Sequence, residues 1–143
     1  MSGLAGLQAT FLTPFLLHFA VVVALYAALT VARATAVRQG RAAFADFARA
    51  GGDPPAAARI ARNLGNQFEA PMFAYFAALF LLWRGEVTSF DVAAAWLFLA
   101  GRLIHTLVQT LTDNVRLRGL VFTINFVGVV ALMAHVAVVV LGW

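Results

Sequence analysis

The stretch RIARNLGNQFE, residues Arg59–Glu69, places two arginines, several side-chain amides and a carboxylate between apolar segments. A polar group in lipid is energetically costly, so such a cluster in an apolar chain is a functional-site hypothesis. At about 100° per residue in a helix, Arg62, Asn66 and Glu69 fall on one stripe. Arg59 lies close beside this stripe. A basic, hydrogen-bonding stripe of this kind suits a small anionic ligand held between helices.

The composition indicates an integral membrane protein. The chain has 143 residues, of which 63% are hydrophobic and only 11% are charged, whereas a soluble domain carries about 25% charged residues. Its length suits one compact bundle and leaves no room for a second domain. The absence of cysteine excludes disulfides, thiolate metal sites and a cysteine nucleophile. A net charge of +4 is too small to indicate nucleic-acid binding.

Four apolar stretches reach the ~20 residues that a helix needs to cross a bilayer. The expected all-α fold is therefore an integral membrane four-helix bundle in one domain, because short links force antiparallel neighbours. A kink is expected near Pro71, Asp53 is expected to cap the second helix, and Thr88–Asp91 resembles a capping box. The expected helices cover about 10–34, 55–83, 89–112 and 115–141.

Arginine placement predicts the orientation in the membrane. The connector between the first two helices and the link between the last two are rich in arginine, whereas the opposite side has only Arg84. The positive-inside rule then places the connector and the site opening in the cytoplasm, with both termini outside.

The remaining polar groups have structural as well as functional interpretations. Arg62 could snorkel to the interface, and Asn66 and Glu69 could tie helices together. In the third helix Arg102 lies near mid-membrane, where we expect it to pair with Glu69. A histidine such as His105 is more often a helix-to-helix hydrogen bonder than a ligand residue. We interpret the other two histidines, His18 and His135, as packing or interface residues, and no pair of histidines and carboxylates has metal-ligand spacing.

Four short motifs in sequence carry a family resemblance. They are the Arg59–Glu69 stretch followed by Pro71, Gly101–Thr106 (GRLIHT), Arg116–Phe122 (RLRGLVF) and Val37–Phe44 (VRQGRAAF). Together they resemble, in order and over nearly the whole chain, the MAPEG family, the membrane-associated proteins of eicosanoid and glutathione metabolism.

The resemblance implies a homotrimer that binds glutathione, as co-substrate, between adjacent subunits. It assigns Arg118 the catalytic role of facing the sulfur, where a guanidinium in a low-dielectric pocket favours the thiolate. A lipophilic electrophile would reach this site from the bilayer lipids. The residues expected to bind glutathione lie on the matching motifs and the third-helix face: Arg38, Arg59, Arg62, Asn66, Glu69, His105, Gln109, Arg116 and Phe122.

Three candidate functions are compatible with these residues. The first is a membrane glutathione transferase or peroxidase acting on lipophilic electrophiles. The second is a non-catalytic lipid- or glutathione-binding protein of the same fold, because Gln109, Gly119 and Phe122 stand where family members carry hydroxyl groups. The third is a small proton-coupled transporter that uses Glu69, although small exporters usually carry that glutamate in the first helix.

Overall fold

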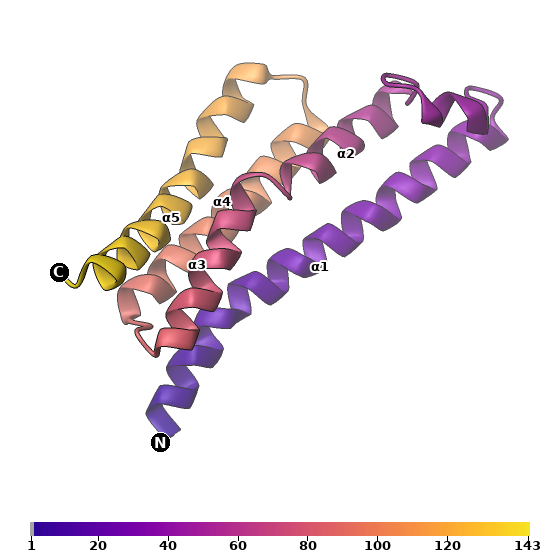
Figure 1. Ribbon diagram of the computed structural model, residues 1–143. Coiled ribbons are helices and arrows are strands. Elements are labelled where there is room, and N and C mark those ends of the chain that lie inside the picture. Colours follow the sequence, from indigo (N-terminus) through magenta and orange to yellow (C-terminus); the bar gives the residue numbers. More distant parts are fainter. Residues whose placement is uncertain (1) are drawn as a thin grey trace.

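The computed structural model describes residues 2–143, with side chains from Gly6 onward, and this part of the chain is helical without strands. The helices α1, α4 and α5 are each long and apolar enough to cross a membrane. In Figure 1, α1 runs obliquely along the bundle and extends beyond it at the end opposite the N-terminus. The elements are α1 (Ser2–Arg38), η1 (Phe44–Ala48), α2 (Pro55–Asn66), α3 (Ala70–Arg84), α4 (Ser89–Leu111) and α5 (Val115–Leu141).

The predicted second helix is broken rather than kinked, which corrects the expected span 55–83. Helices α2 and α3 have 12 and 15 residues and are separated by a turn at Gln67–Glu69. Pro71 explains the position of the break, because a proline ring clashes with the carbonyl four residues earlier and lacks an N–H. Glu69 has φ −88° and ψ −102°, outside the helical region. Figure 1 shows α2 and α3 end to end, with α2 in contact with α4 and α3 in contact with α5, so the pair replaces one spanning helix.

The connector between α1 and α2 folds back onto the end of α1. Asp53, which we expected to cap α2, instead accepts two hydrogen bonds from Arg33, at 2.7 Å from Nε and 2.6 Å from Nη2. The cap position belongs to Pro54, which offers no side-chain hydrogen bond. The guanidinium of Arg33 also lies 5.1 Å from the ring centroid of Phe47. The hydrogen bonds from Arg33 lower the pKa of the Asp53 carboxyl.

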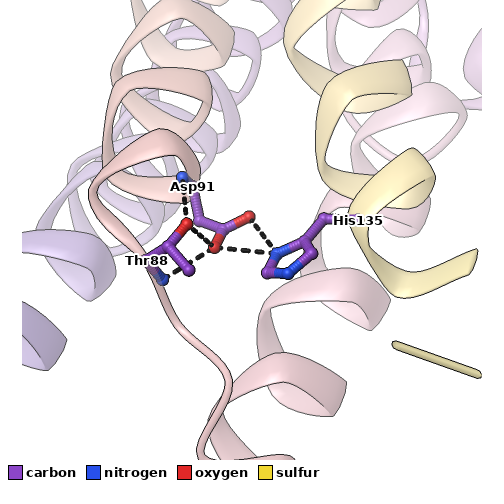
Figure 2. A network of polar contacts seen from close by, with 3 residues as sticks. All are labelled: Thr88, Asp91 and His135. Carbon is purple, nitrogen blue, oxygen red and sulfur yellow. Dashed lines mark hydrogen bonds and ion pairs between the residues drawn. The ribbon is translucent and has the colours of Figure 1, made fainter. Parts of the chain in front are cut away.

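A buried polar network fastens the start of α4 to the end of α5 (Figure 2). The predicted capping box at Thr88 and Asp91 is confirmed. The Asp91 carboxylate is completely buried and lies 2.8 and 2.9 Å from Nδ1 of His135. His135 therefore has a specific polar partner on α4, which adds to its expected packing role. Because Nδ1 must donate to a carboxylate, this contact also fixes which ring nitrogen carries a proton.

Glycines allow α4 and α5 to approach closely, and this is the most extensive helix contact in the bundle. A Cβ added at Gly101 would lie 2.4 Å from the backbone nitrogen of Asn125. A Cβ at Gly128 would lie 2.7 Å from the nitrogen of Phe98 and 2.8 Å from the carbonyl oxygen of Ala94. Membrane helices commonly pack in this way, through small residues that let the backbones meet. The close packing holds the middle of α5 in a fixed position relative to α4.

Candidate functional site

A polar cavity of about 380 Å³ opens between the α2–α3 break, α4 and α5. Five of the residues that the sequence analysis selected come together here, although they lie up to 56 positions apart, from Arg62 to Arg118. Ligand sites typically have volumes of about 300–1,000 Å³, so the space is large enough for a small ligand. The lining residues are Arg62, Gly65, Asn66, Glu69, Gln109 and Arg118.

The charged groups of the cavity have no partners among the described residues. Arg62 and Glu69 are exposed and Arg118 is half-buried, and none of the three side chains makes a hydrogen bond or ion pair within residues 6–143. Asn66 differs, because its amide donates to Gln109 Oε1 at 2.9 Å and so links α2 to α4. The cavity therefore offers two free guanidinium groups, one free carboxylate and a preformed amide pair.

Arg102 is completely buried behind the cavity, and its partners differ from the expected one. Its Nε donates to Gln67 Oε1 at 3.1 Å and its Nη2 donates to the Asn66 carbonyl oxygen at 3.0 Å. The predicted Arg102–Glu69 ion pair is wrong in the part of the chain that the structure describes. The helix break explains the difference, because it turns Gln67 and the Asn66 carbonyl toward α4 and leaves Glu69 exposed. Glu69 is thereby left available to a ligand.

His105 and Phe122 lie one helical turn from the cavity. His105 is one turn from Gln109 on α4, and Phe122 is one turn from Arg118 on α5. Their rings meet edge to face, with centroids 5.8 Å apart. His105 is buried and its Nδ1 has no partner among the described residues, so its contact with the ligand, like that of Phe122, stays a prediction.

Three arginines predicted to bind the ligand lie outside the cavity of this chain. Arg59 donates to both Asp113 oxygens, at 3.2 and 3.1 Å, and so links α2 to the α4–α5 connection. Arg116 is exposed and lies two residues from Arg118, which places it on the far side of α5. Arg38 is exposed at the end of α1. Their role in ligand binding stays a prediction that would require another copy of the chain.

The opposite face of the same stretch holds two functional residues that were not predicted from the sequence. Asn63 and Gln67 are four residues apart on α2 and the following turn, both are buried, and both bond to α4. Gln67 also meets His18, whose Nε2 lies 2.9 Å from Gln67 Oε1. The spacing of Asn63 and Gln67 could have shown a second polar stripe, but nothing in the sequence identified its partners.

Apolar hollows surround the bundle, and one of them follows the cavity along α5. A groove of about 410 Å³ between α3 and α5 contains Phe73, Phe126 and Met133. Phe126 stacks on Phe122, which is one turn from Arg118. A larger hollow of about 640 Å³ between α1 and α3 has no arginine, aspartate or glutamate in its lining. The groove between α3 and α5 therefore lies along the same face of α5 as Arg118 of the charged cavity.

Comparison with known proteins supports the family resemblance. The model of the MAPEG family matches residues 11–138, nearly the whole chain. No curated protein and no solved structure matches. Together with three helices long enough to span a bilayer, this match defines the chain as an integral membrane protein, and it belongs to the MAPEG family.

Proposed function

We propose that this protein is a membrane glutathione transferase or peroxidase that acts on lipophilic electrophiles. The family includes glutathione transferases, and the observation that carries the proposal is the meeting of Arg62, Glu69 and Arg118 in one cavity. Their charges are unpaired among the described residues, so a ligand of opposite charge pattern would satisfy them.

Glutathione has the complementary pattern of charges. It carries two carboxylates, one ammonium group and two amides. Arg62 offers a planar guanidinium that can bind a carboxylate through two hydrogen bonds, and Glu69 offers a carboxylate to the ammonium group. Asn66 and Gln109 offer amide groups at the same wall of the cavity. This fit favours a zwitterionic peptide over a simple anion such as phosphate, which would be repelled by Glu69.

Arg118 is the proposed catalytic residue, because its guanidinium would stabilise the glutathione thiolate. It is half-buried near the start of α5. A cation beside a thiol lowers the thiol pKa, and each unit corresponds to about 1.4 kcal/mol of differential stabilisation. In transfer, the thiolate would attack the electrophilic carbon, and a carbon–sulfur bond would form as the leaving group departs with its electron pair. In peroxide reduction, it would attack a peroxide oxygen, the oxygen–oxygen bond would break, and the alkoxide would leave and take up a proton as the alcohol. A second glutathione would then reduce the resulting glutathione sulfenic acid, giving glutathione disulfide and water.

The second substrate would occupy the apolar groove between α3 and α5. This groove and the polar cavity share the α5 face that carries Arg118 and Phe122. Its wall residues Phe126 and Val130 are exposed, as expected for a path that opens to lipid. A hydrophobic molecule could enter sideways from the bilayer with its reactive carbon near the thiolate.

The proposed assembly is a homotrimer with sites between subunits. Within this chain the cavity is open on one side, with Arg62 and Glu69 exposed. Arg38 lies too far along α1 to line the cavity of its own chain, so an adjacent subunit would have to supply it. Native mass spectrometry of the detergent-solubilised protein tests the assembly, and a monomer would contradict it.

Turnover of glutathione tests the proposed chemistry. Purified protein in detergent is given glutathione with chlorodinitrobenzene, or with a lipid hydroperoxide. The wild type should consume glutathione, and Arg118→Ala should lower the rate by about 100-fold or more, the usual loss for a charge-stabilising group. Arg84→Ala is the matched control, because Arg84 is exposed at the far end of α3.

The alternative outcome would favour a non-catalytic binder. If glutathione stabilises the protein but neither electrophile is converted, the absence of hydroxyl groups at Gln109, Gly119 and Phe122 becomes the explanation. If glutathione neither stabilises the protein nor is consumed, the proposed function is wrong.

A further inference from the structure

Gln67 is the most connected polar side chain in the bundle, and it lies at the break between α2 and α3. It is 2% exposed. Its Oε1 lies 2.9 Å from His18 Nε2 and accepts from Arg102 Nε at 3.1 Å. Its Nε2 donates to Asn63 Oδ1 at 2.8 Å, to the Asn63 carbonyl at 3.1 Å and to Thr106 Oγ1 at 3.3 Å. One amide thus bonds to α1, α2 and α4.

The donor and acceptor roles in this cluster are consistent with one arrangement only. Arg102 Nε always carries a hydrogen, so the atom of Gln67 that faces it must be the oxygen. The same oxygen faces His18 Nε2, which must therefore be the protonated nitrogen of that ring. The amide nitrogen of Gln67 then points to the oxygen atoms of Asn63 and Thr106. Every hydrogen-bonding group of Gln67 is used, so any other side chain at this position leaves buried groups unpaired.

The cluster borders the residues that line the cavity. Arg102 joins Gln67 to the main chain of Asn66, because its Nη2 donates to the Asn66 carbonyl. The Asn66 side chain lines the cavity on the other side of the backbone and bonds to Gln109. Glu69 follows Gln67 by two residues within the same break. The orientation of Asn66 and Glu69 therefore depends on the turn between α2 and α3, which the hydrogen bonds of Gln67 stabilise on its buried side.

We propose that Gln67 is a positioning residue of the polar cavity, which fixes the α2–α3 break so that Asn66 and Glu69 face the bound ligand. The proposal rests on the proposed function for the identity of that ligand, glutathione. Gln67 touches no ligand itself. It acts through Arg102 and through the backbone of the break.

Substitution of Gln67 should weaken glutathione binding, and this loss should be larger than a loss of protein stability alone would cause. Gln67→Met keeps the length of the side chain but removes all of its hydrogen bonds. We expect the Kd for glutathione to rise by about tenfold, the size of coupling typical of polar groups in one network. Gln67→Glu keeps the acceptor contacts with His18 and Arg102 and should restore part of the affinity. It also provides a second variant if Gln67→Met does not fold.

Tyr75→Phe is the matched control. The Tyr75 hydroxyl lies 2.9 Å from His18 Nδ1 and 3.0 Å from the Phe15 carbonyl oxygen, so its loss weakens the same network without touching Gln67 or the break. It should lower the melting temperature but leave the Kd unchanged. If Gln67→Met and Tyr75→Phe lower the melting temperature and neither changes the Kd, Gln67 is only a structural residue and the proposal is overturned.

A spectroscopic measurement separates this proposal from the proposed function. The chain has no cysteine, and a Cβ at Gly65 in the cavity wall meets no atom within 4 Å. A spin label on Gly65→Cys therefore reports the motion of the break without glutathione. Gln67→Met should raise the mobility of that label and Tyr75→Phe should not. If the label gives equal spectra in the otherwise wild-type protein, in Gln67→Met and in Tyr75→Phe, the proposal is overturned, even if glutathione fails to bind the wild type.

Discussion

Both faces of the Arg59–Glu69 stretch carry polar side chains, but the two faces differ in whether those side chains have hydrogen-bond partners. On the buried face, Asn63 and Gln67 have 0% and 2% exposure and bond to neighbouring helices. On the open face, Arg62 and Glu69 are exposed and have no partners among the described residues. Satisfied polar groups specify one arrangement of helices, whereas unsatisfied charges around a cavity are available to a ligand. The buried face therefore fixes the arrangement of the helices around the site, and the open face carries the charges that are available to a ligand.

The largest expected effect comes from adding a side chain where two helices touch, compared with adding one at the cavity wall. Gly128→Leu should prevent folding, because a Cβ there already lies 2.7 Å from the backbone of Phe98 and the helices cannot separate without losing their packing. Gly65→Leu in the cavity wall should fold normally, since a Cβ there meets nothing within 4 Å. Yield and monodispersity in size-exclusion chromatography measure both. A Gly128→Leu protein that behaves like the wild type would contradict the close packing of α4 and α5.

Two carboxylates give the next difference. Asp91 is buried and paired with His135, whereas Glu69 is exposed and unpaired among the described residues. His135→Leu should cost about 3 kcal/mol, because it leaves the completely buried Asp91 carboxylate without its hydrogen-bond donor on α5. Glu69→Gln should change the free energy of unfolding of the ligand-free protein by no more than about 0.5 kcal/mol. Thermal unfolding in detergent compares them, and equal melting temperatures would show that the Asp91 network contributes nothing.

Asn63 and Asn66 provide the same comparison between two identical side chains. Asn63→Ala should destabilise the protein by about 1–3 kcal/mol, since it removes the three hydrogen bonds of a completely buried side chain, to the Thr106 carbonyl, to Thr110 Oγ1 and from Gln67 Nε2. Asn66→Ala removes one hydrogen bond at the cavity wall and should cost about 1 kcal/mol while weakening glutathione binding. Asn63→Ala should therefore lower the melting temperature more than Asn66→Ala does, whereas Asn66→Ala should raise the Kd for glutathione more than Asn63→Ala does. The same order in both measurements would remove the distinction between the two faces.

The connector gives the smallest effect, and it depends on pH. Arg33 lowers the pKa of Asp53 in the folded protein, so the ion pair contributes fully above the unfolded value of about 4 and is lost as the pH falls through the lowered folded value. The melting temperatures of the wild type and Asp53→Asn should therefore differ at pH 7 and converge as the pH falls below about 4 and through the lowered folded pKa of Asp53. If the difference in melting temperature between the two proteins does not change with pH, the charged form of Asp53 contributes nothing to stability.

The sequence predicted the apolar helices and the polar stripe because these depend on local pattern. The bounds of α4 and α5 agree with the expected ones to within one residue. The helix break was underestimated, since Pro71 fixes where a helix is disrupted but tertiary contacts of Gln67 decide how far the chain turns. The partner of Arg102 was wrong for the same reason. Pairing in three dimensions selected the Gln67 amide and the Asn66 carbonyl instead of the Glu69 carboxylate.

The central claim is that the open face binds glutathione through its unpaired charges. The most direct measurement is the shift in melting temperature caused by glutathione in the wild type and in Arg62→Ala. A ligand that binds only the native state must raise stability, by about 2.7 kcal/mol at 100 times its Kd. The account predicts a clear upward shift in the wild type, which is lost in Arg62→Ala and kept in Arg84→Ala. No shift in the wild type, or an equal shift in all three proteins, would contradict it.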